Sequence, residues 1–237
     1  PCVLVLGQEG PGLSAAMLIA AAVTVPETLP AERRHGGELR ELGHAARQVV
    51  GNRRFVAYLV VMAFSMGVTF AYVATSAFIL QSMNGLSPVQ YSIAFAANAV
   101  GLALATLLAG RLAGRVPTRR VITIGLAATG VVGLGLLAAA IWAGMPLLVA
   151  LAGFFLLMSA QGLVGPNAGA LASNEVPEHP GTGSAVLGFL QWCLAGLVAP
   201  IAGLGDSTAV PMAVIIVVLT AGSLTAMAAS RRPAIPN

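Results

Sequence analysis

Long apolar stretches separated by short polar turns dominate the pattern of this chain. No Asp, Glu, Lys or Arg lies between Arg54 and Arg111, and none lies between Arg120 and Glu175. A helix rises about 1.5 Å per residue and a bilayer core is roughly 30 Å thick, so each gap has room for two crossings and a turn. The pattern predicts six transmembrane helices, at 55–80, 90–110, 121–142, 145–167, 184–205 and 208–229, after a shorter apolar span at 11–27.

The composition agrees with a membrane protein. Hydrophobic residues make up 57% of the chain and charged residues 8%, about a third of the charged share that is usual in soluble domains. So few charged side chains cannot coat a soluble domain of this length. The sequence therefore predicts an all-α, polytopic transmembrane helix bundle whose first partner is the lipid bilayer.

The arginines predict how the bundle is oriented. Six of them lie between Glu32 and Arg54, and the others lie in a turn two crossings later and in the C-terminal tail. Loops that carry arginine stay on the cytoplasmic side. We expect a multi-pass protein of the plasma (inner) membrane with a cytoplasmic C-terminus. Since the arginines lie at the ends of apolar spans, no nucleic-acid partner is expected.

Four regions follow from this pattern. Residues 1–29 form a divergent start with a partial transmembrane helix, and 30–54 form a cytoplasmic basic loop. Within that loop, apolar residues at helical spacing favour a helix on the membrane surface over a disordered linker. Residues 55–230 form the six-helix bundle, and 231–237 form a cytoplasmic tail.

A series of short motifs resembles the drug exporters of the major facilitator superfamily, of the Bcr/CflA (bicyclomycin resistance) type. The resemblance covers about residues 20–232 and rests on the order and spacing of the motifs. They are Pro26-Glu27-Thr28-Leu29-Pro30, Asn52-Arg53-Arg54-Phe55, Phe70-Ala71-Tyr72, Gly85-Leu86-Ser87-Pro88, Gly110-Arg111-Leu112-Ala113, Pro166-Asn167, Gly181-Thr182-Gly183-Ser184-Ala185 and Gly188-Phe189-Leu190-Gln191.

This resemblance implies the major facilitator fold and a role in transport. The chain would be the C-terminal six-helix half of a twelve-helix transporter, built from inverted three-helix repeats, with the substrate site between the two halves near the midplane. The implied function is multidrug efflux: a secondary active antiporter that exports drugs or other small amphipathic molecules in exchange for protons. The six spans contain no ionisable residue that could carry the proton, so the missing N-terminal half is expected to supply it.

Polar side chains inside the spans are the candidates for substrate binding. An unsatisfied amide is costly in hydrocarbon, so these side chains face either a neighbouring helix or a water-filled cavity. Both interpretations stay open. The candidates for a substrate cavity are Tyr72, Ser76, Asn98, Gln161, Asn167 and Gln191.

Two other groups of residues have competing interpretations. Small residues and prolines allow close helix packing or flexible gating, and they are Gly165, Pro166, Gly169 and Pro200. A cytoplasmic basic turn has two interpretations: it orients the chain by its charge or, as the resemblance implies, it locks the cytoplasmic ends of the helices together. The family pattern often has an acidic residue where this chain has Gly114, so the ion pair that the pattern implies lacks its acid here. The turn contains Arg111, Arg115, Arg119 and Arg120.

Catalysis is not expected. An intramembrane protease needs a Ser–His pair, two Asp residues or a zinc site inside the membrane, whereas all histidines here lie outside the spans. Neither Cys2 nor Cys193 has the spacing of a metal site or a disulfide, so no metal and no cofactor are predicted. Two alternatives to drug export stay open: an inactive truncated remnant, and a major facilitator for a different small metabolite.

Overall fold

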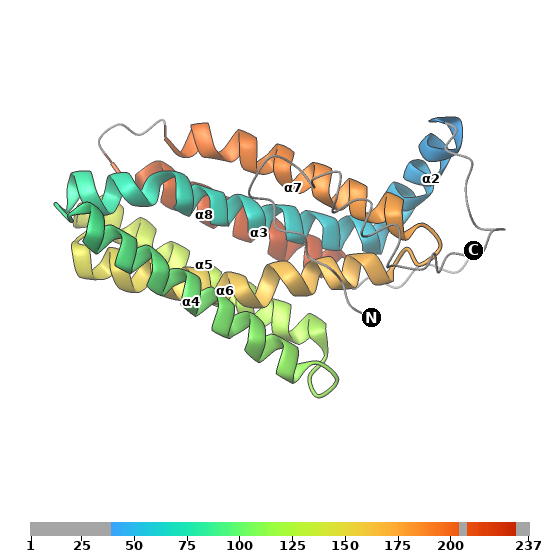
Figure 1. The fold of residues 1–237 in the computed structure, drawn as a ribbon, viewed down its shortest axis with the longest axis horizontal. Coiled ribbons are helices and arrows are strands. Elements are labelled where there is room, and N and C mark those ends of the chain that lie inside the picture. Colours follow the sequence, from blue (N-terminus) through green and yellow to red (C-terminus); the bar gives the residue numbers. More distant parts are fainter. Residues whose placement is uncertain (1–38, 204–207, 231–237) are drawn as a thin grey trace, which may run out of the picture. The chain divides into compact units, whose positions relative to one another are not determined.

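The computed structural model describes residues 39–203 and 208–230, and every regular element in this part of the chain is helical (Figure 1). The first predicted span, Asp206 and the tail lie outside the described residues. The helices are α2 (Leu39–Gly51), α3 (Arg53–Ala77) with its π-helical continuation η2 (Phe78–Met83), α4 (Pro88–Leu112), α5 (Thr118–Trp142), α6 (Leu147–Asn174), α7 (Pro180–Ala202) and α8 (Val210–Ala229).

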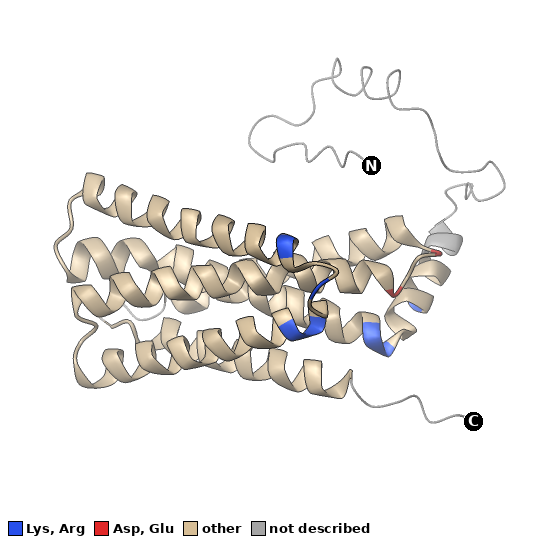
Figure 2. Cartoon of the chain, turned by 90° about the horizontal axis from the view of Figure 1, so that it is seen from below, with Lys and Arg blue, Asp and Glu red and all other residues tan. Residues whose placement is uncertain are grey.

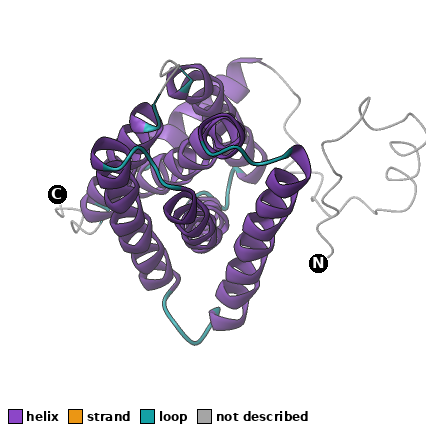
Figure 3. Cartoon of the chain, turned by 90° about the vertical axis from the view of Figure 1, so that its left-hand side faces the viewer, coloured by secondary structure: helices purple, strands orange, loops and turns teal. Residues whose placement is uncertain are grey.

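Six spans in the described residues are long and apolar enough to cross a membrane, with α3 and η2 counted as one. The prediction of an all-α transmembrane bundle is therefore confirmed for this part of the chain. Figure 3 views the bundle from one end and shows helices joined by short turns.

Capping residues start two of the spans. The Asn52 side chain accepts hydrogen bonds from the backbone N–H groups of Arg54 and Phe55, at 3.0 and 3.2 Å. Ser87 and Gln90 form a reciprocal capping box at the start of α4, with Pro88 in the first turn. These side chains bond to N–H groups that have no partner within the helix. The residue at which each of these two helices begins is therefore determined by the local sequence.

Helices α3 and α6 lie at the centre of the packing. Helix α3 packs against α6, α7 and α8, while α6 packs against α3, α4 and α5, and α5 packs against α8. Exchanging α3, α4 and α5 with α6, α7 and α8 leaves this set of main contacts unchanged. Consecutive spans run in opposite directions, so the two triplets are related as inverted repeats.

Two apolar clusters form the core, one above the other along the bundle. One cluster contains Val68 and Leu157 and lies at the end formed by η2 and the α5–α6 turn. The other contains Val61 and Val164 and lies at the end where α2 packs. Both central helices pass from one cluster into the other, so side chains between these positions lie in the middle of the bundle.

The charged residues of the described part gather toward the α2 end (Figure 2). Arg47, Arg53 and Arg54 lie on α2 and at the start of α3, and further arginines follow in the α4–α5 turn. The opposite turns, 84–87 and 143–146, contain no Asp, Glu, Lys or Arg. The charge asymmetry expected from the sequence is thus present in the folded chain.

Helix α6 extends beyond its predicted end. The sequence places the end of this span at 167, next to Pro166, whereas α6 continues to Asn174 with Pro166 inside it. A proline in a helix leaves the carbonyl four residues earlier without its usual donor. In this chain that carbonyl belongs to Gly162, and a residue of α4 supplies the donor.

Candidate functional site

Every span places a polar side chain close to its midpoint. All of them except Asn98, which lies within the cluster that contains Val68, lie between the two apolar clusters, and all except Gln191 are buried. We call this set the mid-span polar layer; it consists of Ser65 (α3), Asn98 (α4), Thr129 (α5), Gln161 (α6), Gln191 (α7) and Thr220 (α8).

Gln161 connects three helices within this layer. Ser65 Oγ donates a hydrogen bond to Gln161 Oε1, and Gln161 Nε2 lies 3.4 Å from Thr129 Oγ1. Gln161 is only 3% exposed, so its amide is shared between α3, α5 and α6 inside the bundle. This arrangement corresponds to the interhelical hydrogen bonding that was one of its two interpretations.

Asn98 lies beside an aromatic cluster. Its Nδ2 donates to the Tyr72 hydroxyl at 2.9 Å, and the Tyr72 ring packs against Phe95 and Phe154, with centroids 5.9 and 5.2 Å away. The cluster joins α3, α4 and α6. A group of rings beside a few polar atoms is typical of sites for small amphipathic molecules.

Ser76 extends this cluster by one turn of α3. Its hydroxyl lies 3.1 Å from the hydroxyl of Tyr91, and the Tyr91 ring contacts Phe95 at 5.9 Å between centroids. Tyr91 is partly exposed whereas Ser76 is buried. The structure thus brings three predicted residues together: Tyr72, Ser76 and Asn98.

Gln191 is placed differently. It lies on the face of α7 that packs against the bundle, between Leu187 and Val198, and its Oε1 is buried without a hydrogen-bond partner. Asn167, by contrast, donates to the Leu163 carbonyl of its own helix at 2.9 Å. Gln191 therefore presents an open acceptor in the polar layer, and the substrate role of all six predicted residues stays a prediction.

The small residues of α6 lie against neighbouring helices. A Cβ added to Gly169 would lie 3.1 Å from Met62 Sδ, and one added to Gly165 would lie 3.4 Å from Ser65 Oγ. Pro200, on α7, is exposed. The contacts of the two glycines describe close packing with α3.

Thr106 is a residue that sequence reasoning missed. Its hydroxyl is shared between two carbonyl acceptors, that of Leu102 on its own helix at 2.9 Å and that of Gly162 on α6 at 3.1 Å. The Gly162 carbonyl is the one that Pro166 leaves without a backbone donor. A threonine inside an apolar span carries no local signal of such a contact, because its partner lies 56 positions away on another helix. This contact could have been predicted only by knowing that Pro166 frees a carbonyl and that a helix with a hydroxyl side chain packs beside it.

Within the basic turn, Arg119 differs from the other arginines. Its guanidinium donates to the Met227 carbonyl near the end of α8 and lies 3.5 Å from the Tyr58 hydroxyl on α3. The remaining arginines of the turn are exposed, and they are Arg111, Arg115 and Arg120. One cation therefore joins the ends of α5 and α8 to α3, whereas a locking role stays a prediction.

No cluster of three or more His, Cys, Asp or Glu side chains suited to a metal ion occurs in the described ranges. The cysteine in these ranges, Cys193, is free and exposed on α7. The chemistry offered by the site is hydrogen bonding and aromatic contact in an apolar surrounding.

Comparisons with known proteins agree with this architecture. The family model described as Major Facilitator Superfamily matches residues 10–200. A Bacillus subtilis (strain 168) protein described as "Uncharacterized MFS-type transporter YdgK" is 29% identical over 209 residues, or 88% of this chain and 52% of that protein. The chain thus spans about half the length of this curated relative. Neither comparison specifies the Bcr/CflA type. The family match covers most of the chain, and together with the six membrane-length helices it shows that this integral membrane protein belongs to the Major Facilitator Superfamily.

Proposed function

We propose that this chain is one six-helix half of a secondary transporter that exports drugs or other small amphipathic molecules across the inner membrane in exchange for protons. The observation that carries the proposal is the mid-span polar layer. Substrate sites of such transporters lie near the bilayer midplane, and here Gln191 Oε1 is an acceptor without a partner at that level. The motifs resembling Bcr/CflA exporters support drugs as the substrate class.

The proposal includes a second six-helix half. The chain covers 52% of its relative, and α4 and α7 bury fewer residues than the central helices α3 and α6. Exposed apolar side chains on α4, such as Ile93 and Leu104, fit contact with either lipid or a second half. A site between two halves would then have the faces of α4 and α7 as one wall.

Proton coupling requires a side chain within the membrane that can take up and release a proton. The six described spans, 53–83, 88–112, 118–142, 147–174, 180–202 and 210–229, contain no Asp, Glu or His. Ionisable residues within spans are the usual proton carriers. The carrying carboxylate would therefore belong to the other half, and this half would contribute substrate contacts and packing.

The substrate contacts can be tested by drug resistance of cells that express the full-length protein. We expect Asn98→Leu and Gln191→Leu to change which drugs are tolerated while the protein level in the membrane stays unchanged. Thr220→Val is the matched control, because Thr220 is buried at the same level but its hydroxyl bonds within its own helix, to the Ile216 carbonyl at 2.6 Å. An unchanged spectrum in both leucine variants would count against the substrate role.

The coupling ion can be tested separately in inside-out vesicles that contain the full-length protein. Drug uptake should require an imposed pH gradient and should stop when a protonophore collapses it. Uptake that continues without the gradient would exclude proton exchange, and uptake of a metabolite rather than of any drug would favour the alternative major facilitator function.

A further inference from the structure

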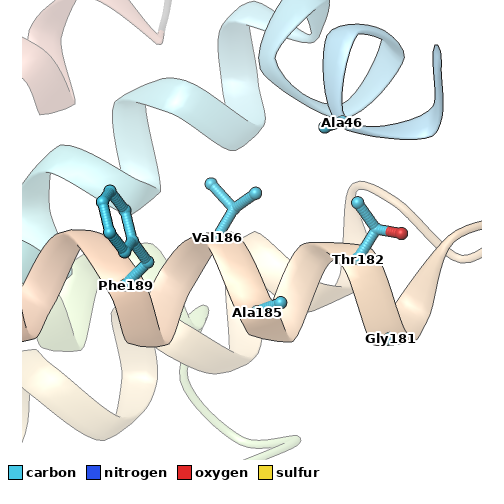
Figure 4. Close-up of a pocket in the computed structure, with 6 residues that line it drawn as sticks. All are labelled: Ala46, Gly181, Thr182, Ala185, Val186 and Phe189. Carbon is cyan, nitrogen blue, oxygen red and sulfur yellow. The ribbon is translucent and has the colours of Figure 1, made fainter. Parts of the chain in front are cut away.

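A groove opens between α2 and α7, away from the mid-span polar layer (Figure 4). Its volume is about 400 Å³, and Thr182 contributes the only polar side-chain atoms among the lining residues. The α7 residues recur at helical spacing along one face, and α2 contributes one residue. The lining consists of Ala46, Gly181, Thr182, Ala185, Val186 and Phe189.

The groove lies on the outer face of α7. The opposite face of this helix, with Gly183 and Leu187, is buried against the bundle, whereas Phe189 is 72% exposed. Helix α2 is held beside it by two buried residues, Ala45 and Val49. An apolar groove is thus held open where an amphipathic helix meets the beginning of a membrane-spanning helix.

The described residues around the groove include more arginines than acids. Glu175 and the exposed Glu178 lie in the loop before α7, and three arginines outnumber them. Arg47 follows Ala46 on α2 and is exposed, and Arg53 and Arg54 are exposed at the start of α3. Helix α7 begins at Pro180, so the positive end of its dipole points to the same side. An occupant with an apolar body and an anionic head therefore complements both the lining and the charge.

We propose that this groove binds an acyl chain of an anionic phospholipid from the bilayer, with the lipid phosphate beside Arg47. The apolar lining disfavours a soluble anion, because such an ion would lose its hydration without gaining contacts. Anionic headgroups attract arginines near the membrane surface, and each buried methylene adds to the binding free energy. The site is separate from the proposed substrate contacts and does not depend on what is transported.

Photo-crosslinking of the full-length protein in nanodiscs tests the proposal. The probes are phosphatidylglycerol and phosphatidylcholine that carry the same photoreactive group on one acyl chain, and the labelled peptides are identified by mass spectrometry. The acyl chain of either lipid can enter the groove, but only phosphatidylglycerol has a net negative charge. We expect labels on the α7 segment 181–189, with phosphatidylglycerol preferred by about fivefold for each arginine that it contacts.

Two variants separate the parts of the site. Ala185→Trp fills the groove and should remove most labelling by both lipids, while Ala127→Trp, at an exposed alanine of α5, should not. Arg47→Gln should lower the preference for phosphatidylglycerol about fivefold, while Arg115→Gln, in the α4–α5 turn, which contributes no residue to the groove lining, should leave it unchanged. Since Arg47 is exposed, its variant tests the charge contact even if the tryptophan variant folds poorly.

The labelling experiment can support or overturn the lipid site. Preferred labelling of segment 181–189 that falls in Ala185→Trp and Arg47→Gln supports it. Equal labelling by the two lipids, or labelling that Ala185→Trp leaves unchanged, overturns it. Labelling of this segment by a photoreactive drug in place of either lipid overturns it too, and would assign the groove to the substrate.

Discussion

The contact between Gly162 and α4 shows how a single residue sets the distance between two spans. A Cβ added to Gly162 would lie 2.4 Å from the carbonyl oxygen of Leu102 and 3.0 Å from Ala105 Cβ. The first of these atoms belongs to the helix backbone, so it cannot turn away as a side chain could. Glycine at 162 is therefore required by close approach and not by backbone conformation.

Gly162→Ala should consequently destabilise the bundle. We expect a loss of about 1–3 kcal/mol in the free energy of unfolding, the usual cost of overpacking a core, measured in mixed micelles of increasing SDS fraction. Gly135→Ala is the matched control, since a Cβ there meets nothing within 4 Å, and it should be at least as stable as the parent. Equal stability of the two variants would show that α4 and α6 can separate freely.

At the scale of the element, Pro166 and Thr106 act together on α6. We expect Thr106→Val to cost about 1 kcal/mol in the free energy of unfolding, because valine keeps the shape of the side chain but removes the hydroxyl donor that lies 3.1 Å from the Gly162 carbonyl oxygen. Thr106→Ser should retain most of the stability.

A double-mutant cycle identifies the cause. Pro166→Ala restores a backbone N–H that can donate to the Gly162 carbonyl, so Thr106→Val should cost much less in that background. Thr225→Val is a control for loss of a hydroxyl, because Thr225 is exposed and bonds only within α8. Equal costs of Thr106→Val in both backgrounds would mean that the hydroxyl acts independently of the proline.

Arg119 joins elements at the opposite end of the bundle from η2. Arg119→Gln removes the charged donor from the Met227 carbonyl, and we expect a loss of about 2 kcal/mol together with faster amide hydrogen exchange at the end of α8. Arg119→Lys should recover only part of this, because an ammonium cannot reproduce the guanidinium fork. Arg120→Gln is the control, since Arg120 is exposed, and exchange as slow in Arg119→Gln as in this control would contradict the role.

The elements themselves could be predicted from the sequence, but their contacts could not. Uncharged gaps and arginine positions predict six spans because membrane thickness fixes their length. The extension of α6 past Pro166 could not be predicted, since the donor to the carbonyl that Pro166 leaves free comes from another helix, from Thr106. Likewise the polar candidates could be recognised by type, whereas the pairing of Asn98 with Tyr72 and of Gln161 with Ser65 depends on how the helices pack.

At the scale of the whole molecule, the arginines at one end predict how the bundle lies in the membrane. Loops that carry arginine stay on the cytoplasmic side, so the α4–α5 turn should be cytoplasmic and the α5–α6 turn should face the opposite side. Ala113 and Ala143 are exposed alanines in these two turns. Because α5 lies between them, a cysteine at Ala113 and one at Ala143 should be accessible from opposite sides of the membrane.

Single-cysteine variants of the full-length protein test this orientation. In a background in which the native cysteines are replaced by serine, Ala143→Cys should react with a membrane-impermeant maleimide in cells whose outer membrane is permeable. Ala113→Cys should react only after the inner membrane is opened. The reverse pattern would place the arginines on the outer side of the membrane. Reaction of both cysteines in sealed cells would mean that α5 does not cross the membrane.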